Sequence, residues 1–215
     1  MRAAVLFADL RGYTRLCEQL SPEAIVPLLN EYFALLGRIT GAHAGTVFHT
    51  AGDGMMVGFG VRSDNGDCPA QALLAARAML TEFETLAVSW RERFGIHVAL
   101  GVGLHVGSVM AARVGTSERS EYTLIGDSVN VAARLCQRAR AGEVLFSGSL
   151  RQGLDSEHLA EGARALPSLS LRGRTEPVEV YCLACAQRLE VEGGREVRNR
   201  GMVSILSEQQ LPASV

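Results

Sequence analysis

Residues 46–59 of this chain run Thr-Val-Phe-His-Thr-Ala-Gly-Asp-Gly-Met-Met-Val-Gly-Phe. Two short segments suited to strands, Thr46–Thr50 and Met55–Phe59, flank the glycine-rich segment Ala51–Gly54. An Asp-Gly pair between strand-forming residues is among the strongest local signals for a hairpin turn. The stretch therefore predicts a β-hairpin with one carboxylate, Asp53, at its turn.

A long amphipathic helix is predicted on each side of this hairpin. Before it, Ser21-Pro22-Glu23 is typical of a helix start, with a capping serine and a proline at the first helical position. Apolar residues then recur every three or four positions, as one buried helix face requires. The first stripe is Ile25, Leu29, Tyr32, Leu36 and Ile39, and the second is Leu73, Ala76, Leu80, Phe83, Ala87, Trp90 and Phe94.

Two apolar strands complete the pattern at its ends. Ala3–Ala8 leads to Asp9, and Ile96–Val106 follows the second helix. The resulting order, βαββαβ, is that of a ferredoxin-like sheet, so we expect an α+β fold. In that topology the first strand lies between the third and the fourth, and its end lies beside the hairpin turn. We therefore expect Asp9 to lie next to Asp53.

The rest of the chain extends this core at its C-terminal side. We expect an irregular arm, a third helix, a strand, and a terminal strand pair. Residues 1–186 are expected to form one domain, and the polar, glycine-bearing residues 187–215 a tail. The expected segments are the arm Ala111–Tyr122, the helix Ser128–Arg140, the strand Val144–Ser147, and the pair near Leu169–Leu171 and Val178–Leu183.

Composition argues against several classes of protein. The formal net charge of −2 disfavours a nucleic-acid partner, and no apolar run approaches the about 18 residues that span a bilayer. The first strand begins too close to Met1 for a signal peptide, so we expect a cytoplasmic protein. Cys182 and Cys185 lie three apart on a predicted strand, which favours unpaired cysteines over a metal site.

The pair of Asp9 and Asp53 is the main chemical signal. Adjacent carboxylates raise each other's pKa unless a cation neutralises them. Mg²⁺ commonly takes a few carboxylates together with substrate phosphates. The segment Leu10-Arg11-Gly12-Tyr13-Thr14 then leads into a helix whose first amides can receive a phosphate. Spacing alone equally allows a capping aspartate and a turn aspartate.

Two further groups of polar residues indicate a binding site for a nucleotide only when they are considered together. Asn130 and Arg134 are four residues apart and share one face of the third helix, where they can orient a sugar and stabilise phosphoryl charge. The basic turn Arg172-Gly173-Arg174 can contact terminal phosphates. Taken alone, the first pair is more often a solvated helix face and the second a surface loop. His105, within a predicted strand, is expected to be a packed core residue.

Together these segments resemble the class III adenylate and guanylate cyclases, from about Ala3 to Leu183. The resemblance implies closure of a nucleoside triphosphate to a 3′,5′-cyclic monophosphate with two Mg²⁺ or Mn²⁺ ions. The family's two metal motifs, its Asn/Arg segment and its basic turn are similar to residues 5–14, 51–56, 122–134 and 171–178.

The resemblance also implies a role for each matching residue. Asp9, Asp53 and the carbonyl group of Leu10 would hold the metal ions. Asn130 would orient the ribose, and Arg134 would stabilise charge at the α-phosphorus. The family's site forms between two chains, so a homodimer joined partly by the arm would hold two sites. The remaining expected substrate contacts are Gly12, Tyr13, Thr14, Arg172 and Arg174, and the base-reading positions His49 and Thr123.

One position departs from the family pattern. The adenine-selecting lysine, four residues before the second metal aspartate, is replaced by His49, while its partner position falls on Thr123. Nothing resembles the glutamate that reads guanine, so we expect ATP as substrate and cyclic AMP as product. The alternatives are a weak or inactive nucleotide-binding or dimerisation module and a cyclase acting on GTP or another triphosphate. A diguanylate cyclase would carry a different sequence at Ala51–Met55.

Overall fold

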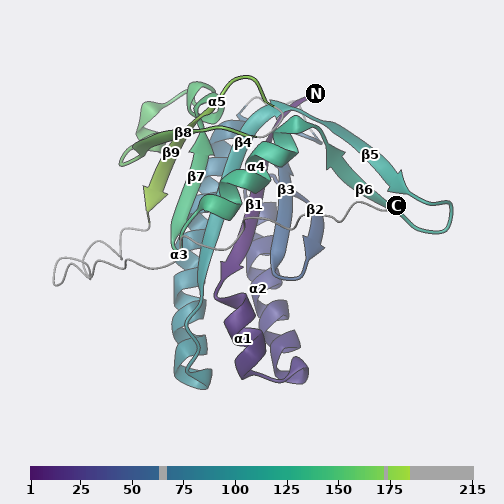
Figure 1. The fold of residues 1–215 in the computed structure, drawn as a ribbon, viewed down its shortest axis with the longest axis vertical. Coiled ribbons are helices and arrows are strands. Elements are labelled where there is room, and N and C mark those ends of the chain that lie inside the picture. The colour runs from purple at the N-terminus through teal and green to yellow at the C-terminus, as the bar shows by residue number, and fades with distance from the viewer. Residues whose placement is uncertain (63–66, 172–173, 185–215) are drawn as a thin grey trace, which may run out of the picture. The chain divides into compact units, whose positions relative to one another are not determined.

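The computed structural model describes residues 1–62, 67–171 and 174–184, which belong to one compact unit, residues 1–185. The predicted tail 187–215 and the residues Arg172 and Gly173 lie outside the described residues. In chain order the elements are β1 (Arg2–Arg11), α1 (Tyr13–Gln19), α2 (Pro22–Ala42), β2 (Thr46–Ala51), β3 (Gly54–Phe59), α3 (Cys68–Phe94), β4 (Ala99–Ser108), β5 (Met110–Gly115), β6 (Ser120–Ile125), α4 (Asp127–Arg138), β7 (Glu143–Ser147), α5 (Gly148–Gln152), a 3-10 helix (Glu157–Ala160), β8 (Arg164–Leu169) and β9 (Val178–Ala184) (Figure 1).

The described strands form a seven-stranded sheet in the order β2-β3-β1-β4-β7-β9-β8. Strand β1 lies between β3 and β4 and is antiparallel to both. This confirms the predicted ferredoxin-like core. Strand β7 extends the core by pairing in parallel with β4, and β9 and β8 follow as antiparallel neighbours.

Alternate residues of β1 face two different layers. Leu6 and Leu10 belong to the main core, where they pack with buried residues of α2 and α3 such as Tyr32 and Trp90. Val5, on the opposite face, belongs to a second cluster that includes residues of α4. The sheet is therefore covered by α2 and α3 on one face and by α4 on the other, as Figure 1 shows.

Helix α4 lies unusually close to strand β4, and a glycine allows this approach. A Cβ atom added at Gly103 would fall 2.5 Å from the carbonyl oxygen of Ala132 and 2.6 Å from the Cα atom of Cys136. Real side chains do not tolerate such distances to backbone atoms. Gly103 therefore determines how deeply α4 packs onto the sheet.

The prediction of an irregular arm over Ala111–Tyr122 is wrong. Strands β5 and β6 pair there antiparallel, from Met110↔Ile125 to Gly115↔Ser120, as a separate two-stranded sheet. Figure 1 shows this hairpin projecting from the body of the domain. Most of its residues are exposed on both faces. Without a buried face the sequence lacks the apolar alternation by which strands are predicted.

The strand predicted near Leu169–Leu171 also lies elsewhere, because β8 covers Arg164–Leu169. This strand contains Pro167, which cannot donate a ladder hydrogen bond. Its place at the edge of the sheet explains why the proline is tolerated. Among the described residues, no helix combines the length and the apolar character needed to cross a membrane.

Candidate functional site

The sheet brings the two predicted metal carboxylates together. Asp9 lies near the end of β1, and the β1–β3 register pairs Ala8 with Met55, two residues after Asp53. The Oδ2 atom of Asp53 accepts a hydrogen bond of 3.2 Å from the backbone amide of Leu10. Both carboxylates are partly buried. The structure thus places Asp9, Leu10 and Asp53 together, where β1 ends beside the turn between β2 and β3.

Burial and mutual repulsion disfavour a charged Asp53. Burial raises the pKa of its carboxyl group above the ordinary value, and the neighbouring charge of Asp9 raises it further. In the described ranges 1–62, 67–171 and 174–184, no three His, Cys, Asp or Glu side chains come close enough to share a metal. Two carboxylates and a backbone carbonyl are the hard oxygen donors that suit Mg²⁺ or Mn²⁺ with substrate oxygens completing the shell.

The start of α1 lies beside this carboxylate pair. The pKa of Tyr13 is raised chiefly by its hydrogen bond with Cys17, with a smaller contribution from the charge of Asp53. Gly12 precedes the helix with φ +94°, and a Cβ atom there would lie 2.8 Å from the carbonyl oxygen of His97. Backbone geometry therefore requires glycine at this position. Thr14 is exposed in the first turn of α1.

Arg11 is a member of this site that the sequence interpretation did not identify. Its Nη1 atom pairs with Asp9, its Nη2 atom donates to the carbonyl oxygen of Cys136, and its Nε atom donates to that of Ala139 at 2.9 Å. The available signal was its position two residues after Asp9 on a strand, which places both side chains on one face.

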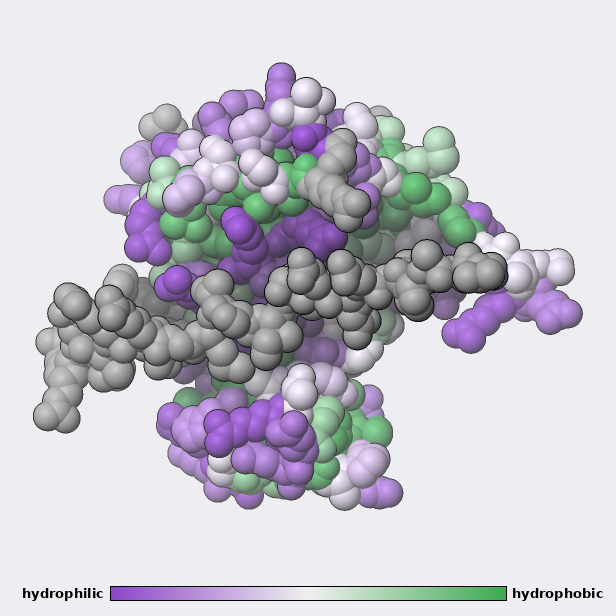
Figure 2. Space-filling view, in the orientation of Figure 1, coloured by the Kyte–Doolittle hydropathy of each residue, from purple (hydrophilic) through white to green (hydrophobic). Residues whose placement is uncertain are grey.

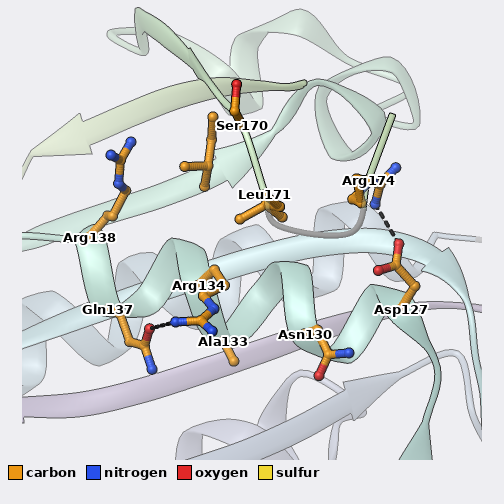
Figure 3. Close-up of a pocket in the computed structure, with 10 residues that line it drawn as sticks. Asp127, Asn130, Ala133, Arg134, Gln137, Arg138, Ser170, Leu171 and Arg174 are labelled. Carbon is orange, nitrogen blue, oxygen red and sulfur yellow. Dashed lines mark hydrogen bonds and ion pairs between the residues drawn. The ribbon is translucent and has the colours of Figure 1, made fainter. Parts of the chain in front are cut away.

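Asn130 and Arg134 lie on the exposed side of α4, at a cavity of about 770 Å³. Figure 3 shows both side chains on the helix, below Leu171 and Arg174. Arg134 Nη1 donates to Gln137 Oε1 at 3.1 Å, and Arg174 Nη1 donates to Asp127 Oδ2 at 2.6 Å. Figure 2 shows hydrophilic residues gathered in the middle of this face. The cavity therefore presents arginines suited to anionic groups.

One chain therefore carries two separate groups of predicted site residues. Of the described residues, those that line the cavity are Asp127, Asn130, Ala133, Arg134, Gln137, Arg138, Leu169, Ser170, Leu171 and Arg174. This set does not contain Asp9 or Asp53. Neither group alone contains all the predicted site residues.

The residue that His49 contacts is Glu121, which the sequence interpretation overlooked. His49 Nδ1 lies 3.4 Å from Glu121 Oε2, and about half of each side chain is exposed. Arg119 approaches the other carboxylate oxygen at 3.7 Å. Thr123 lies two residues further along β6, on the same strand face as Glu121. The predicted base-reading position, His49, thus lies beside a carboxylate.

His105 has the predicted core position. It is buried, and its Nδ1 atom lies 2.9 Å from Ser147 Oγ. Burial lowers the pKa of His105 from 6.5 to about 4. The imidazole is therefore neutral near pH 7.

The sequence model of the adenylate and guanylate cyclase catalytic domain matches residues 2–185. An adenylate cyclase of Anabaena cylindrica is 28% identical over 183 residues, which are 84% of this chain and 36% of that protein. An uncharacterized protein of Mycobacterium tuberculosis is 36% identical over 182 residues, 82% of this chain and 31% of its own length. The chain thus spans about a third of these curated relatives.

Solved structures show the same fold. The adenylyl cyclase CyaB from P. aeruginosa superposes with a TM-score of 0.77 at 31% identity, covering 84% of this chain and 92% of that one. The guanylyl cyclase Cya2 also gives a TM-score of 0.77, at 24% identity, covering 86% and 98% of the two chains. At that lower identity the second likeness concerns the fold alone.

Proposed function

This chain belongs to the family of adenylate and guanylate cyclase catalytic domains, and from this we propose that it is an active cyclase that converts ATP into 3′,5′-cyclic AMP and pyrophosphate. The observation that carries the proposal is the pair of adjacent, partly buried carboxylates, Asp9 and Asp53, in a domain that also presents Asn130 and Arg134. An inactive module would have no need to keep Asp53 beside a second carboxylate that disfavours its charge.

The carboxylate pair fits two divalent cations. Asp9, Asp53 and the carbonyl group of Leu10 would hold Mg²⁺ or Mn²⁺, because all three supply hard oxygen donors. The pKa of Asp53 is raised by burial and by the charge of Asp9, and a bound cation would offset that rise. When bound, such ions lower the pKa of an attacking hydroxyl group and neutralise triphosphate charge.

The arginines and the asparagine would act on the substrate directly. In the proposed reaction the 3′ oxygen forms a bond to the α-phosphorus while the bond from that phosphorus to pyrophosphate breaks. Arg134 would stabilise the charge that develops there, and Asn130, one turn earlier on α4, would orient the ribose. Arg174 would leave its partly exposed partner Asp127 to hold the terminal phosphates. Further contacts to the substrate would come from Gly12, Tyr13, Thr14 and Arg172.

We further propose a homodimer in which the carboxylates of one chain face Asn130 and Arg134 of the other. The separation of the two groups within one chain supports this arrangement. The β5–β6 hairpin offers a surface for it, because it exposes four large apolar side chains, which are unfavourable in water. These are Met110, Val114, Tyr122 and Ile125.

Mixing two inactive variants tests the dimer. Chains with Asp9→Ala and chains with Arg134→Ala should form some dimers with one intact site, so activity should return on mixing. Subunit exchange is checked separately, by native mass spectrometry. Mixed dimers that are present but no more active than either parent would disprove the shared site.

One contact in the structure supports a second candidate for the base of the substrate. A carboxylate such as Glu121 can accept hydrogen bonds from the N1–H and exocyclic amine of guanine, whereas His49 can donate or accept. GTP is therefore the alternative substrate, and Glu121 is the observation in its favour.

The deciding experiment incubates the protein with each of the four nucleoside triphosphates and Mg²⁺ or Mn²⁺, and identifies the products by mass spectrometry. We expect cyclic AMP to form with the highest kcat/KM and Asp53→Ala to form none. A higher kcat/KM with GTP would assign the alternative, and no cyclic product from any triphosphate would favour the inactive module.

A further inference from the structure

Arg11 connects the carboxylate pair to the far end of α4. Three of its nitrogen atoms are engaged at once, with Asp9, Cys136 and Ala139. The last carbonyl groups of a helix have no partner within the helix, and a cation there is favourable. A guanidinium group has donors in fixed, divergent directions and can serve a carboxylate and two carbonyls together. Arg11 is thus both the C-terminal cap of α4 and the ion-pair partner of Asp9.

The neighbouring strand makes room for this arrangement. Gly101 on β4 pairs with Asp9, and a Cβ atom there would fall 2.6–2.8 Å from the Arg11 guanidinium atoms. The Arg11 side chain is only 22% exposed and that of Asp9 39%. The guanidinium group therefore occupies a defined, partly dehydrated position, unlike an exposed surface arginine.

We propose that Arg11 is a positioning residue shared by the two active sites of the dimer. The inference rests on the proposed function, in which Asp9 serves one site while α4 carries Asn130 and Arg134 to the other. One guanidinium group then adjusts two things: the cation affinity of its own chain's carboxylates, and the placement of α4 in the opposite site.

The two roles can be separated by choice of substitution. Arg11→Gln removes the charge and most of the contacts to α4. Arg11→Lys keeps the charge, but a lysine cannot span the carboxylate and both carbonyl groups. Arg38→Gln is the matched control, because Arg38 pairs with Glu82 on the exposed surface of α2 and α3 and loses the same charge.

The first measurement needs no turnover. Mn²⁺ binding to the intact chain, followed by calorimetry or electron paramagnetic resonance, should be about two- to tenfold tighter in Arg11→Gln, because a competing positive charge is gone. Arg11→Lys and Arg38→Gln should bind Mn²⁺ like wild type. Unchanged affinity in Arg11→Gln would overturn the first role.

The second measurement uses dimers with one intact site, formed from Asp53→Ala chains and Arg134→Ala chains. Arg11→Gln in the Arg134→Ala chain, which supplies the carboxylates, should lower the metal concentration for half-maximal rate. The same substitution in the Asp53→Ala chain, which supplies α4, should lower kcat several-fold and leave that concentration unchanged. An effect from one placement alone would overturn the shared role.

Failure of the proposed function would be recognised separately. If the wild-type protein formed no cyclic nucleotide, the proposed cyclase function would be refuted. The Mn²⁺ comparison among the three variants would still show whether Arg11 controls the carboxylate pair.

Discussion

Replacing Gly103 by alanine tests how α4 is placed. The added Cβ atom would lie 2.1–2.6 Å from backbone atoms of Ala132 and Cys136, whereas ordinary contact begins at 3.4 Å. Helix α4 would therefore have to move from the sheet by about 1.3 Å, the difference between 3.4 and 2.1 Å. The obstructing atoms belong to the helix backbone, so no side-chain rotation can relieve the clash.

The expected cost lies at the upper end of the range for overpacked cores, about 3 kcal/mol. For a domain of this size 1 kcal/mol shifts Tm by about 2–4 °C, so Tm should fall by about 6–12 °C. Gly37→Ala is the matched control, because it adds the same methyl group within α2 with no atom inside 4 Å. That control should gain about 0.5–1 kcal/mol from helix propensity.

The assay is thermal unfolding followed by circular dichroism in metal-free buffer, with cyclase rates measured well below either midpoint. Because α4 carries Asn130 and Arg134, a displacement near 1 Å should also lower kcat by up to about a hundredfold. A Gly103→Ala protein as stable and as active as the Gly37→Ala control would refute the packing described for α4.

Three further changes test other features. Asp53→Asn should abolish turnover yet raise the Tm of metal-free protein at pH 7, because burial and Asp9 raise the pKa of Asp53 and so penalise its charge; the gain should shrink as pH falls toward about 4, and equal Tm values at pH 7 would contradict this. Because the pKa of His105 is lowered to about 4, protons bind the unfolded state first as pH falls from 6.5 to 4. Urea unfolding should show a loss of about 3 kcal/mol over that range, which His105→Gln should remove. His49→Lys should supply a firm donor for adenine and raise the ATP-over-GTP ratio of kcat/KM by at most about ten- to a hundredfold; an unchanged ratio would mean that His49 does not read the base.

The core of the fold was predictable because its segments are strongly periodic. Helix stripes, two buried strands and an Asp-Gly turn determine the order βαββαβ, and that order alone places Asp9 beside Asp53. The β5–β6 hairpin was not predicted as strands, since exposure on both faces removes the alternation that marks a strand.

The contacts of Arg11 and Glu121 could not be predicted from the sequence, for a different reason. Each depends on how closely two elements approach in space. Gly101 and Gly103 interrupt a strand when viewed in sequence, yet they make room for Arg11 and for α4. The distance between two elements in space cannot be predicted from the pattern of residue types along the chain.

The central position of β1 has a consequence for how the chain acquires its structure. Both of its partners are distant in sequence: the β1–β3 register joins Ala4 to Phe59, and the β1–β4 register joins Arg2 to Ser108. Such long-range pairing requires closing large loops, which slows folding. During synthesis the apolar β1 must wait until β4, up to Ser108, has emerged before the sheet can close around it. Asp9 meets Asp53 through the β1–β3 pairing, which joins Ala8 to Met55, so cation binding should appear only once that long-range pair has formed.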